Sequence, residues 1–167
     1  MSELATQCQA LRSGIGYCDL TGRTQIELIG ADRVKVLHGL CTNDIKRLVP
    51  GGGCEAFLTN VQGKTTGYVN VFCLESSLII DTNPGLAEEM IPALDKYVIR
   101  EDVKFVDRSN DWAEFLVSGT AAEQSLQSDF IGSVPSPRVG VSMGTLSGVE
   151  VQLRRLPYVR SEERRVG

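Results

Sequence analysis

Short runs in which apolar and polar residues alternate, separated by turn-forming residues, occur along much of the chain. Between Thr24 and Ile29, the apolar Ile26 and Leu28 alternate with Gln25 and Glu27. A period of two residues is typical of a β-strand with one buried face. The pattern predicts a strand with Ile26 and Leu28 turned toward a core and Gln25 and Glu27 turned toward solvent.

Helical spacing follows this strand. After Gly30, the apolar residues Val34, Leu37 and Leu40 recur on one side of a helix. A second helix is predicted to begin at Asn83, because asparagine is a favoured N-cap and a proline follows it at the first helical position. Both helices have one apolar side, so we expect each to pack on a sheet.

The stretch from Cys54 to Phe72 predicts a β-hairpin, since two strand-like runs flank a turn that contains Asn60 and Gly63. The tripeptide at 63–65, Gly-Lys-Thr, imitates the end of a phosphate-binding loop. That loop needs a further glycine five positions before Gly63, where this chain has Leu58. The spacing argues against a phosphate loop and places Lys64 just past the turn, facing solvent or an anionic ligand.

The order strand, glycine, helix occurs twice, around Gly30 and again around Gly119, and a second putative hairpin follows at 139–153. This repetition predicts an α+β fold of duplicated split β-α-β (ferredoxin-like) units, with antiparallel or mixed sheets and helices packed on them. Residues 1–107 are expected to form the first β-α-β-β-α unit and 108–160 a second, incomplete unit. Residues 161–167 are expected to be a charged tail.

The second predicted unit stops before its second helix. A missing helix leaves apolar surface uncovered, so either another copy of the chain covers it, giving a homo-oligomer, or the native protein continues past Gly167. We favour a fragment of a longer protein.

Composition removes several classes of function. A net charge of −4 and a pI near 5.1 argue against a nucleic-acid platform, which needs a basic stripe. No apolar run approaches the ~20 residues of a membrane span.

Five cysteines without a Cys-x-x-Cys pair indicate neither a zinc site nor a disulfide framework, but reduced thiols in the cytoplasm. His38 is the only histidine, so a Ser-His-Asp triad or a two-histidine metal site would need a partner to complete it.

Four segments follow one another in a set order: DLTGRTQIELIGADRVKVLHGLCTNDIKRL, the glycine-rich loop at 50–53, CEAFLTNVQGK and LIIDTNPG. Together they resemble the N-terminal folate-binding region of the glycine-cleavage T-protein (aminomethyltransferase) superfamily. The resemblance covers residues 15–110 well and the rest loosely. Gly63-Lys64 and the entry Asp19–Arg23 are closest to the YgfZ branch, folate-binding proteins linked to iron–sulfur cluster maintenance.

The resemblance implies tetrahydrofolate as cofactor and folate derivatives and iron–sulfur proteins as partners. It suggests a pocket in which Phe72 stacks on the pterin, Asp81 lies near the position of the family's pocket asparagine, and Lys64 faces the glutamate tail. The residues expected to bind the cofactor are Arg23, Asn60, Lys64, Tyr68, Phe72 and Asp81. Three of them also have structural interpretations, Phe72 as core, Tyr68 as a packing residue and Asp81 as a turn cap.

T-proteins carry paired aspartates on the outgoing strand of this hairpin, and the second is catalytic. The corresponding positions read Gly67 and Tyr68 here. Neither glycine nor a phenol with a pKa near 10 is an evident replacement for a carboxylate, so no catalytic residue is predicted.

Three functions therefore stay open. The first is a folate-binding, non-catalytic module that supports iron–sulfur cluster assembly or repair. The second is an aminomethyltransferase whose carboxylate comes from Asp81 or from another domain. The third is an interaction or dimerisation module that keeps the fold without a ligand.

Overall fold

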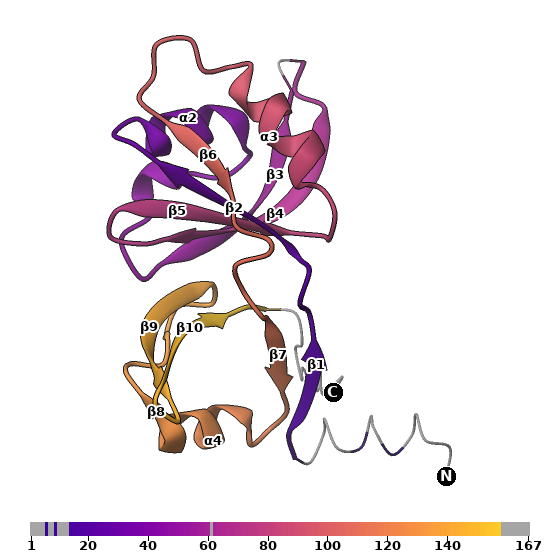
Figure 1. The fold of residues 1–167 in the computed structure, drawn as a ribbon, viewed down its shortest axis with the longest axis vertical. Helices are drawn as coiled ribbons and strands as arrows, with labels where there is room; N and C mark the ends of the chain where they lie inside the picture. Colours follow the sequence, from indigo (N-terminus) through magenta and orange to yellow (C-terminus); the bar gives the residue numbers. More distant parts are fainter. Residues whose placement is uncertain (1–5, 7–8, 10–13, 61, 158–167) are drawn as a thin grey trace, which may run out of the picture.

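The computed structural model describes residues 6, 9, 14–60 and 62–157, and Figure 1 shows two regions stacked along the long axis. The strands are β1 (Gly16–Asp19), β2 (Thr24–Ile29), β3 (Gly53–Thr59), β4 (Thr65–Cys73), β5 (Ser77–Thr82), β6 (Lys104–Asp107), β7 (Phe115–Ser118), β8 (Phe130–Ile131), β9 (Gly140–Leu146) and β10 (Val149–Arg155). The helices are α2 (Arg33–Leu40), the short 3-10 helix η1 (Ile45–Arg47), α3 (Ala87–Asp95) and α4 (Ala122–Asp129). All strand pairs of the described sheets are antiparallel, which confirms the predicted α+β class.

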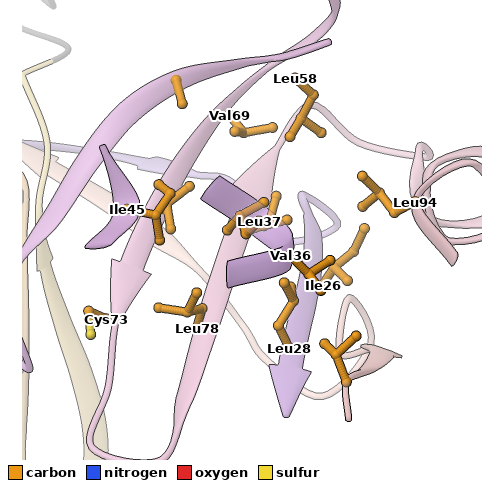
Figure 2. Packing of buried hydrophobic residues seen from close by; sticks show 14 residues of the cluster. Ile26, Leu28, Val36, Leu37, Ile45, Leu58, Val69, Cys73, Leu78 and Leu94 are labelled. Atoms are coloured by element: carbon orange, nitrogen blue, oxygen red, sulfur yellow. The ribbon is translucent and has the colours of Figure 1, made fainter. Parts of the chain in front are cut away.

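The upper region is a five-stranded sheet in the order β3-β4-β5-β2-β6. Alternation along each strand sends one set of side chains into a core shared with α2 and α3 (Figure 2). Ile26 and Leu28 of β2 pair with Ile80 and Leu78 of β5, and all four are fully buried. A buried side chain of this size contributes roughly 1.5–3 kcal/mol, so this face accounts for much of the stability of the region.

The predicted hairpin is present as β3 and β4, but the second helix starts later than its cap pattern predicts. Asn83, Pro84 and Gly85 form a turn, with Gly85 at a φ of +78°, and α3 begins at Ala87. A positive φ is incompatible with a right-handed helix, so the proline at position 84 shapes a turn and does not begin the helix. The backbone N–H of Leu86 donates to Thr24 Oγ1 at 2.9 Å, which fixes the start of α3 against β2.

The lower region has two smaller sheets. β1 pairs with β7 as a two-stranded ribbon, and β10-β9-β8 form a three-stranded sheet beside α4. The sheet joins the upper region at Gly140, which bridges Gly52, and through the adjacent hydrogen bond from the Val141 N–H to the Gly51 carbonyl at 2.9 Å. The second predicted hairpin is β9 and β10, turning through Ser147 and Gly148, both at positive φ.

The two glycine corners expected from the sequence have the same geometry. Gly30 has a φ of +119°, and a Cβ there would lie 2.2 Å from the carbonyl oxygen of Asp102; Gly119 has a φ of +131°, and a Cβ would lie 2.1 Å from the carbonyl oxygen of Gly14. Two residues after each glycine, a backbone N–H donates to that same carbonyl. Asp102 precedes β6 and Gly14 precedes β1, so β1 stands to β7 as β6 stands to β2. The unit boundary at residue 107 remains a prediction. β1 lies before this residue in the sequence and pairs with β7, which lies after it.

Several large apolar side chains of the lower region are exposed, among them Tyr17 and Phe115 on the ribbon.

No helix within the described ranges is long and apolar enough to cross a membrane. Nor do the described histidine, cysteine, aspartate and glutamate side chains gather in a group of three or more that could hold a metal ion.

Candidate functional site

The face of the five-stranded sheet opposite α2 and α3 carries polar side chains where the other face carries the core. Asn70 of β4, Asp81 of β5 and Gln25 of β2 are neighbours across adjacent strands, since Asn70 pairs with Asp81 and Asp81 with Gln25. All three are buried. The sequence predicts that Gln25 faces solvent; this is wrong, because the lower region and its linker cover that side of β2.

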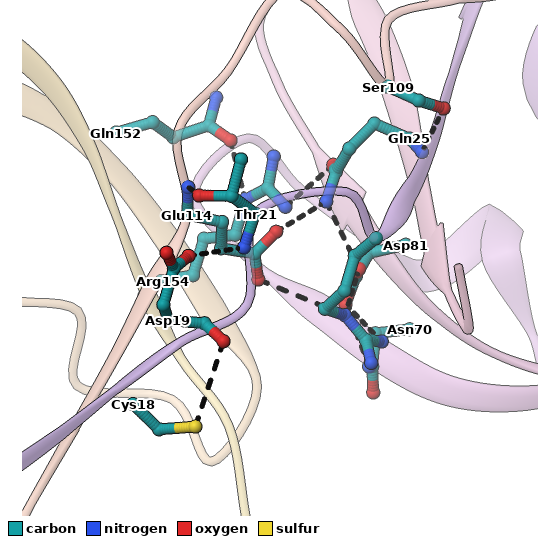
Figure 3. Close-up of polar contacts among 11 residues, drawn as sticks. Cys18, Asp19, Thr21, Gln25, Asn70, Asp81, Ser109, Glu114, Gln152 and Arg154 are labelled. Carbon is teal, nitrogen blue, oxygen red and sulfur yellow. Dashed lines mark hydrogen bonds and ion pairs between the residues drawn. The ribbon is translucent and has the colours of Figure 1, made fainter. Parts of the chain in front are cut away.

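Asp81 is the centre of this polar layer, with a side chain that is 0% exposed. Arg23 binds it through two hydrogen bonds, Nε to Oδ1 at 2.7 Å and Nη2 to Oδ2 at 3.0 Å. The side-chain amides of Gln25 and Asn70 each donate a further hydrogen bond at 3.1 Å (Figure 3). A buried carboxylate is tolerated only when it is paired and hydrogen-bonded in this way.

The layer extends to the lower region through Glu114 and Arg154 (Figure 3). Gln25 Nε2 also donates to Glu114 Oε2 at 2.7 Å, and Arg154 Nη1 donates to Gln25 Oε1 at 2.8 Å. Burial raises the pKa of Glu114 above its ordinary value, and the charge of Asp81 acts in the same direction, whereas Arg154 and Arg23 oppose the rise. Two arginines and two carboxylates therefore form one ionic network between the two regions, which we call the Asp81 network.

Phe72 lies beside this network, in the core between the sheets. Its side chain is 0% exposed and packs with Ile79, Val139 and Val141. The guanidinium of Arg154 lies over the ring, with Cζ 4.9 Å from the centroid. Phe72 is thus a core residue with Arg154 over its ring, and its stacking on a pterin stays a prediction.

Tyr68 lies on the same face of β4 but nearer the hairpin turn, and it is partly exposed. Its hydroxyl donates to Glu55 Oε1 at 2.6 Å, and its ring meets Phe57 edge to face at 5.5 Å between centroids. Arg138, from the loop before β9, donates to Glu55 Oε2 at 3.4 Å. These four side chains form a second polar and aromatic cluster, the Glu55 cluster.

Asn60 and Lys64 lie at the hairpin turn. Asn60 Oδ1 accepts the backbone N–H groups of Gln62 and Lys64, both at 3.0 Å, so this side chain holds the turn closed. Lys64 is exposed. Of the six residues predicted to bind a cofactor, the structure joins Arg23 to Asp81 directly, places Tyr68 and Phe72 on one strand beside them, and leaves Asn60 and Lys64 at the tip.

The sequence did not single out Gln25, Asn70, Glu55, Glu114 or Arg154 as site residues. Asn70 carries a signal, because it is the polar residue in the apolar run that ends at Phe72. Glu114 and Arg154 carry none, since their positions depend on how the second region packs onto the first.

A cleft of about 710 Å³ is lined by Ile79 and Val141, which pack with Phe72, and by Trp112, Met143 and the ion-paired Glu27 and Arg108. Its volume is in the range of small-molecule sites. Gln152, which accepts a 2.6 Å hydrogen bond from Arg154 Nε, lines it and connects it to the Asp81 network.

The described cysteines are free thiols, and three of them are poorly suited to nucleophilic chemistry. Burial raises the pKa of Cys41 and of Cys73, and it raises that of Cys54 to about 11. A thiol with such a pKa stays protonated near neutral pH, and the thiolate is the reactive form.

Comparison with known proteins identifies the class of the chain. The model of the GCVT N-terminal domain matches residues 1–162, so the chain belongs to this domain family, as the resemblance to the T-protein superfamily predicts.

Several relatives of the chain are aminomethyltransferases. The aminomethyltransferase of Bacillus cytotoxicus is 28% identical over 127 residues, which is 75% of this chain and 34% of that protein. That of Geobacillus kaustophilus is 26% identical over 160 residues, 94% of this chain and 44% of that protein. The chain thus spans between a third and a half of the length of these relatives.

The fold has a solved counterpart. The glycine cleavage system aminomethyltransferase T of Bartonella henselae superposes with a TM-score of 0.68 at 16% identity, covering 89% of this chain and 44% of that chain. At this identity the likeness establishes the fold alone.

Proposed function

We propose that this domain binds tetrahydrofolate on the polar face of its five-stranded sheet, as part of a protein that transfers a one-carbon unit to that cofactor. The observation that carries the proposal is the match of residues 1–162 to the GCVT N-terminal domain family, and the hydrogen-bonded layer of Arg23, Gln25, Asn70 and Asp81 gives this face a rigid floor. Membership supports the cofactor, and the names of the relatives favour aminomethyl transfer as the activity of the whole protein.

The residues expected at the cofactor take different parts in this proposal. Arg23 and Asp81 hold the floor of the site rigid through their paired hydrogen bonds. Tyr68 is the exposed aromatic residue of the strand, and Lys64 offers a cation to the glutamate tail. Phe72 supports the floor from beneath Arg154, and Asn60 fixes the turn that presents Lys64.

A second candidate is a folate-binding protein of the YgfZ type that supports iron–sulfur cluster assembly or repair, with iron–sulfur proteins as partners. It is favoured by Gly67 and Tyr68, which stand where T-proteins have paired aspartates. In this candidate folate binds but no aminomethyl group is transferred.

Two further properties belong to the proposal. Free cysteines are in keeping with a cytoplasmic protein. The exposed Tyr17 and Phe115 of the ribbon support self-association, because exposed apolar patches mark contact surfaces. Size-exclusion chromatography over a range of concentrations tests the second property, and a monomer at every concentration would refute it.

Calorimetric titration of the chain with 5-formyltetrahydrofolate tests the cofactor. We expect saturable heat with one site per chain, and no heat would refute folate binding and leave an interaction module. Formation of methylenetetrahydrofolate from an aminomethyl-lipoyl carrier then separates the two candidates. Turnover would establish the transferase, and binding without turnover would favour the YgfZ-type protein.

A further inference from the structure

The Glu55 cluster has the features of a recognition site for a flat ring. Phe57 and Tyr68 are 47% and 39% exposed, yet their rings are fixed edge to face at 5.5 Å with an interplanar angle of 62°. Aromatic side chains of this size are usually buried, and an exposed pair of defined geometry offers apolar area at low entropic cost to a planar ligand.

The carboxylate of this cluster is held in place and is still accessible. Glu55 accepts from the Tyr68 hydroxyl at 2.6 Å and from Arg138 at 3.4 Å, and its side chain is 34% exposed. A carboxylate offers about four acceptor positions, so these two donors leave capacity for a ligand. Asp81, in contrast, is fully buried and already accepts four hydrogen bonds, two from Arg23 and one each from Gln25 and Asn70.

The position of Glu55 decides which part of a ligand it meets. An aminopyrimidine ring that carries an oxo group presents two adjacent N–H donors along one edge, one from the ring and one from the exocyclic amine. Two parallel donors match the two oxygens of a carboxylate, and such charge-assisted pairs are stronger and more directional than neutral ones. A carboxylate beside an exposed aromatic pair therefore fits the aminopyrimidine edge of a pterin.

We propose that Glu55 binds the aminopyrimidine edge of the folate pterin while Phe57 and Tyr68 pack against the ring. This inference rests on the proposed folate function and names the residues that recognise the ring. It places the pterin nearer the hairpin turn than Phe72, whose ring is buried and covered by Arg154. Arg138 and the Tyr68 hydroxyl act as positioning groups, because each donates to the carboxylate that would meet the ligand.

Glu55→Gln tests the proposal, since glutamine keeps the shape and replaces one acceptor oxygen with a donor. We expect 5-formyltetrahydrofolate to bind this variant about 10- to 100-fold more weakly than it binds the original chain, the effect of losing a charged hydrogen bond. Glu89→Gln is the matched control, with the same change of charge at an exposed position of α3, on the opposite face of the sheet. It should bind as the original chain does.

A second measurement needs no variant. The 2-desamino-2-methyl analogue of folate lacks the exocyclic donor, so the original chain should bind it about tenfold more weakly than folate. Glu55→Gln should lose this preference, while its urea midpoint stays within error of that of Glu89→Gln.

The outcomes separate the two levels of the proposal. If the original chain binds folate but makes no distinction between folate and the analogue, or if Glu55→Gln binds within twofold of it, the role of Glu55 is refuted and folate binding stands. If the original chain binds no folate at all, the proposed function itself is refuted.

Discussion

Both regions of the molecule contain the same glycine corner, but the strands around the two corners differ in how much side-chain surface they bury. Gly30 and Gly119 turn the chain in the same way after a strand. At each glycine, a carbonyl oxygen occupies the space that a Cβ would fill. Around Gly30 the sheet has five strands and a core against two helices, whereas around Gly119 the strands are divided between a ribbon and a small sheet. Equal local geometry therefore does not imply equal stability, because stability depends on what the strands bury.

The joint between the regions should be the most sensitive point. Phe72→Ala removes a fully buried ring from the contact between β4 and the lower sheet, and we expect it to lower the free energy of unfolding by about 3–5 kcal/mol. Phe115→Ala makes the same change on the exposed ribbon and should cost less than about 0.5 kcal/mol. Urea denaturation measures both. Equal losses would mean that the ribbon is covered in solution.

The Asp81 network gives the next comparison. Arg23→Met leaves a fully buried carboxylate without its cation, and such losses cost about 3–5 kcal/mol. Arg108→Met breaks an ion pair of similar length with Glu27, but the arginine is 38% exposed, so the expected loss is below about 1 kcal/mol. Chemical denaturation at pH 7 checks the difference. A cost below about 1 kcal/mol for Arg23→Met would show that water reaches Asp81.

The two corners can be compared directly with alanine. Gly30→Ala forces a Cβ against the Asp102 carbonyl at a φ of +119°, and we expect a loss of about 2–3 kcal/mol. Gly119→Ala should cost less, although its contact is as short, because the exposed ribbon strand β1 has less packing to hold it in place. Thermal and urea unfolding of both variants test this. The opposite order would show that the lower region is the more rigid one.

The sequence-based predictions succeed for local patterns and fail where the two regions of the molecule meet. Alternation in β2, the hairpin of β3 and β4 and the repeated glycine corner are local patterns, and the structure contains all of them. The predicted start of α3 at Asn83 is wrong. The proline at position 84 suits a helix start as well as a turn, and the positive φ of Gly85 makes this segment a turn. The burial of Gln25 and the parts played by Glu114 and Arg154 arise where two regions meet, and no local period encodes such a contact.

The smallest expected effect concerns the loop that leads into β6. Glu101 accepts hydrogen bonds from the backbone N–H groups of Arg100 and Ile99 and from the Lys35 ammonium, and these hydrogen bonds lower its pKa to about 2. A lowered pKa in the folded state adds stability above the unfolded pKa near 4.5, and this stability is lost as the pH falls toward 2.

Glu101→Gln should therefore reduce stability slightly at pH 7 and flatten the decline between pH 4.5 and 2, as measured by urea midpoints across that range. Glu123→Gln is the matched control on α4 of the lower region, where the carboxylate pairs with Arg155 on the surface. An unchanged acid profile for Glu101→Gln would mean that the loop before β6 opens before Glu101 is protonated. The corner at Gly30 would then be held by the Asp102 carbonyl and the packing of β6, and not by the charge of its neighbour.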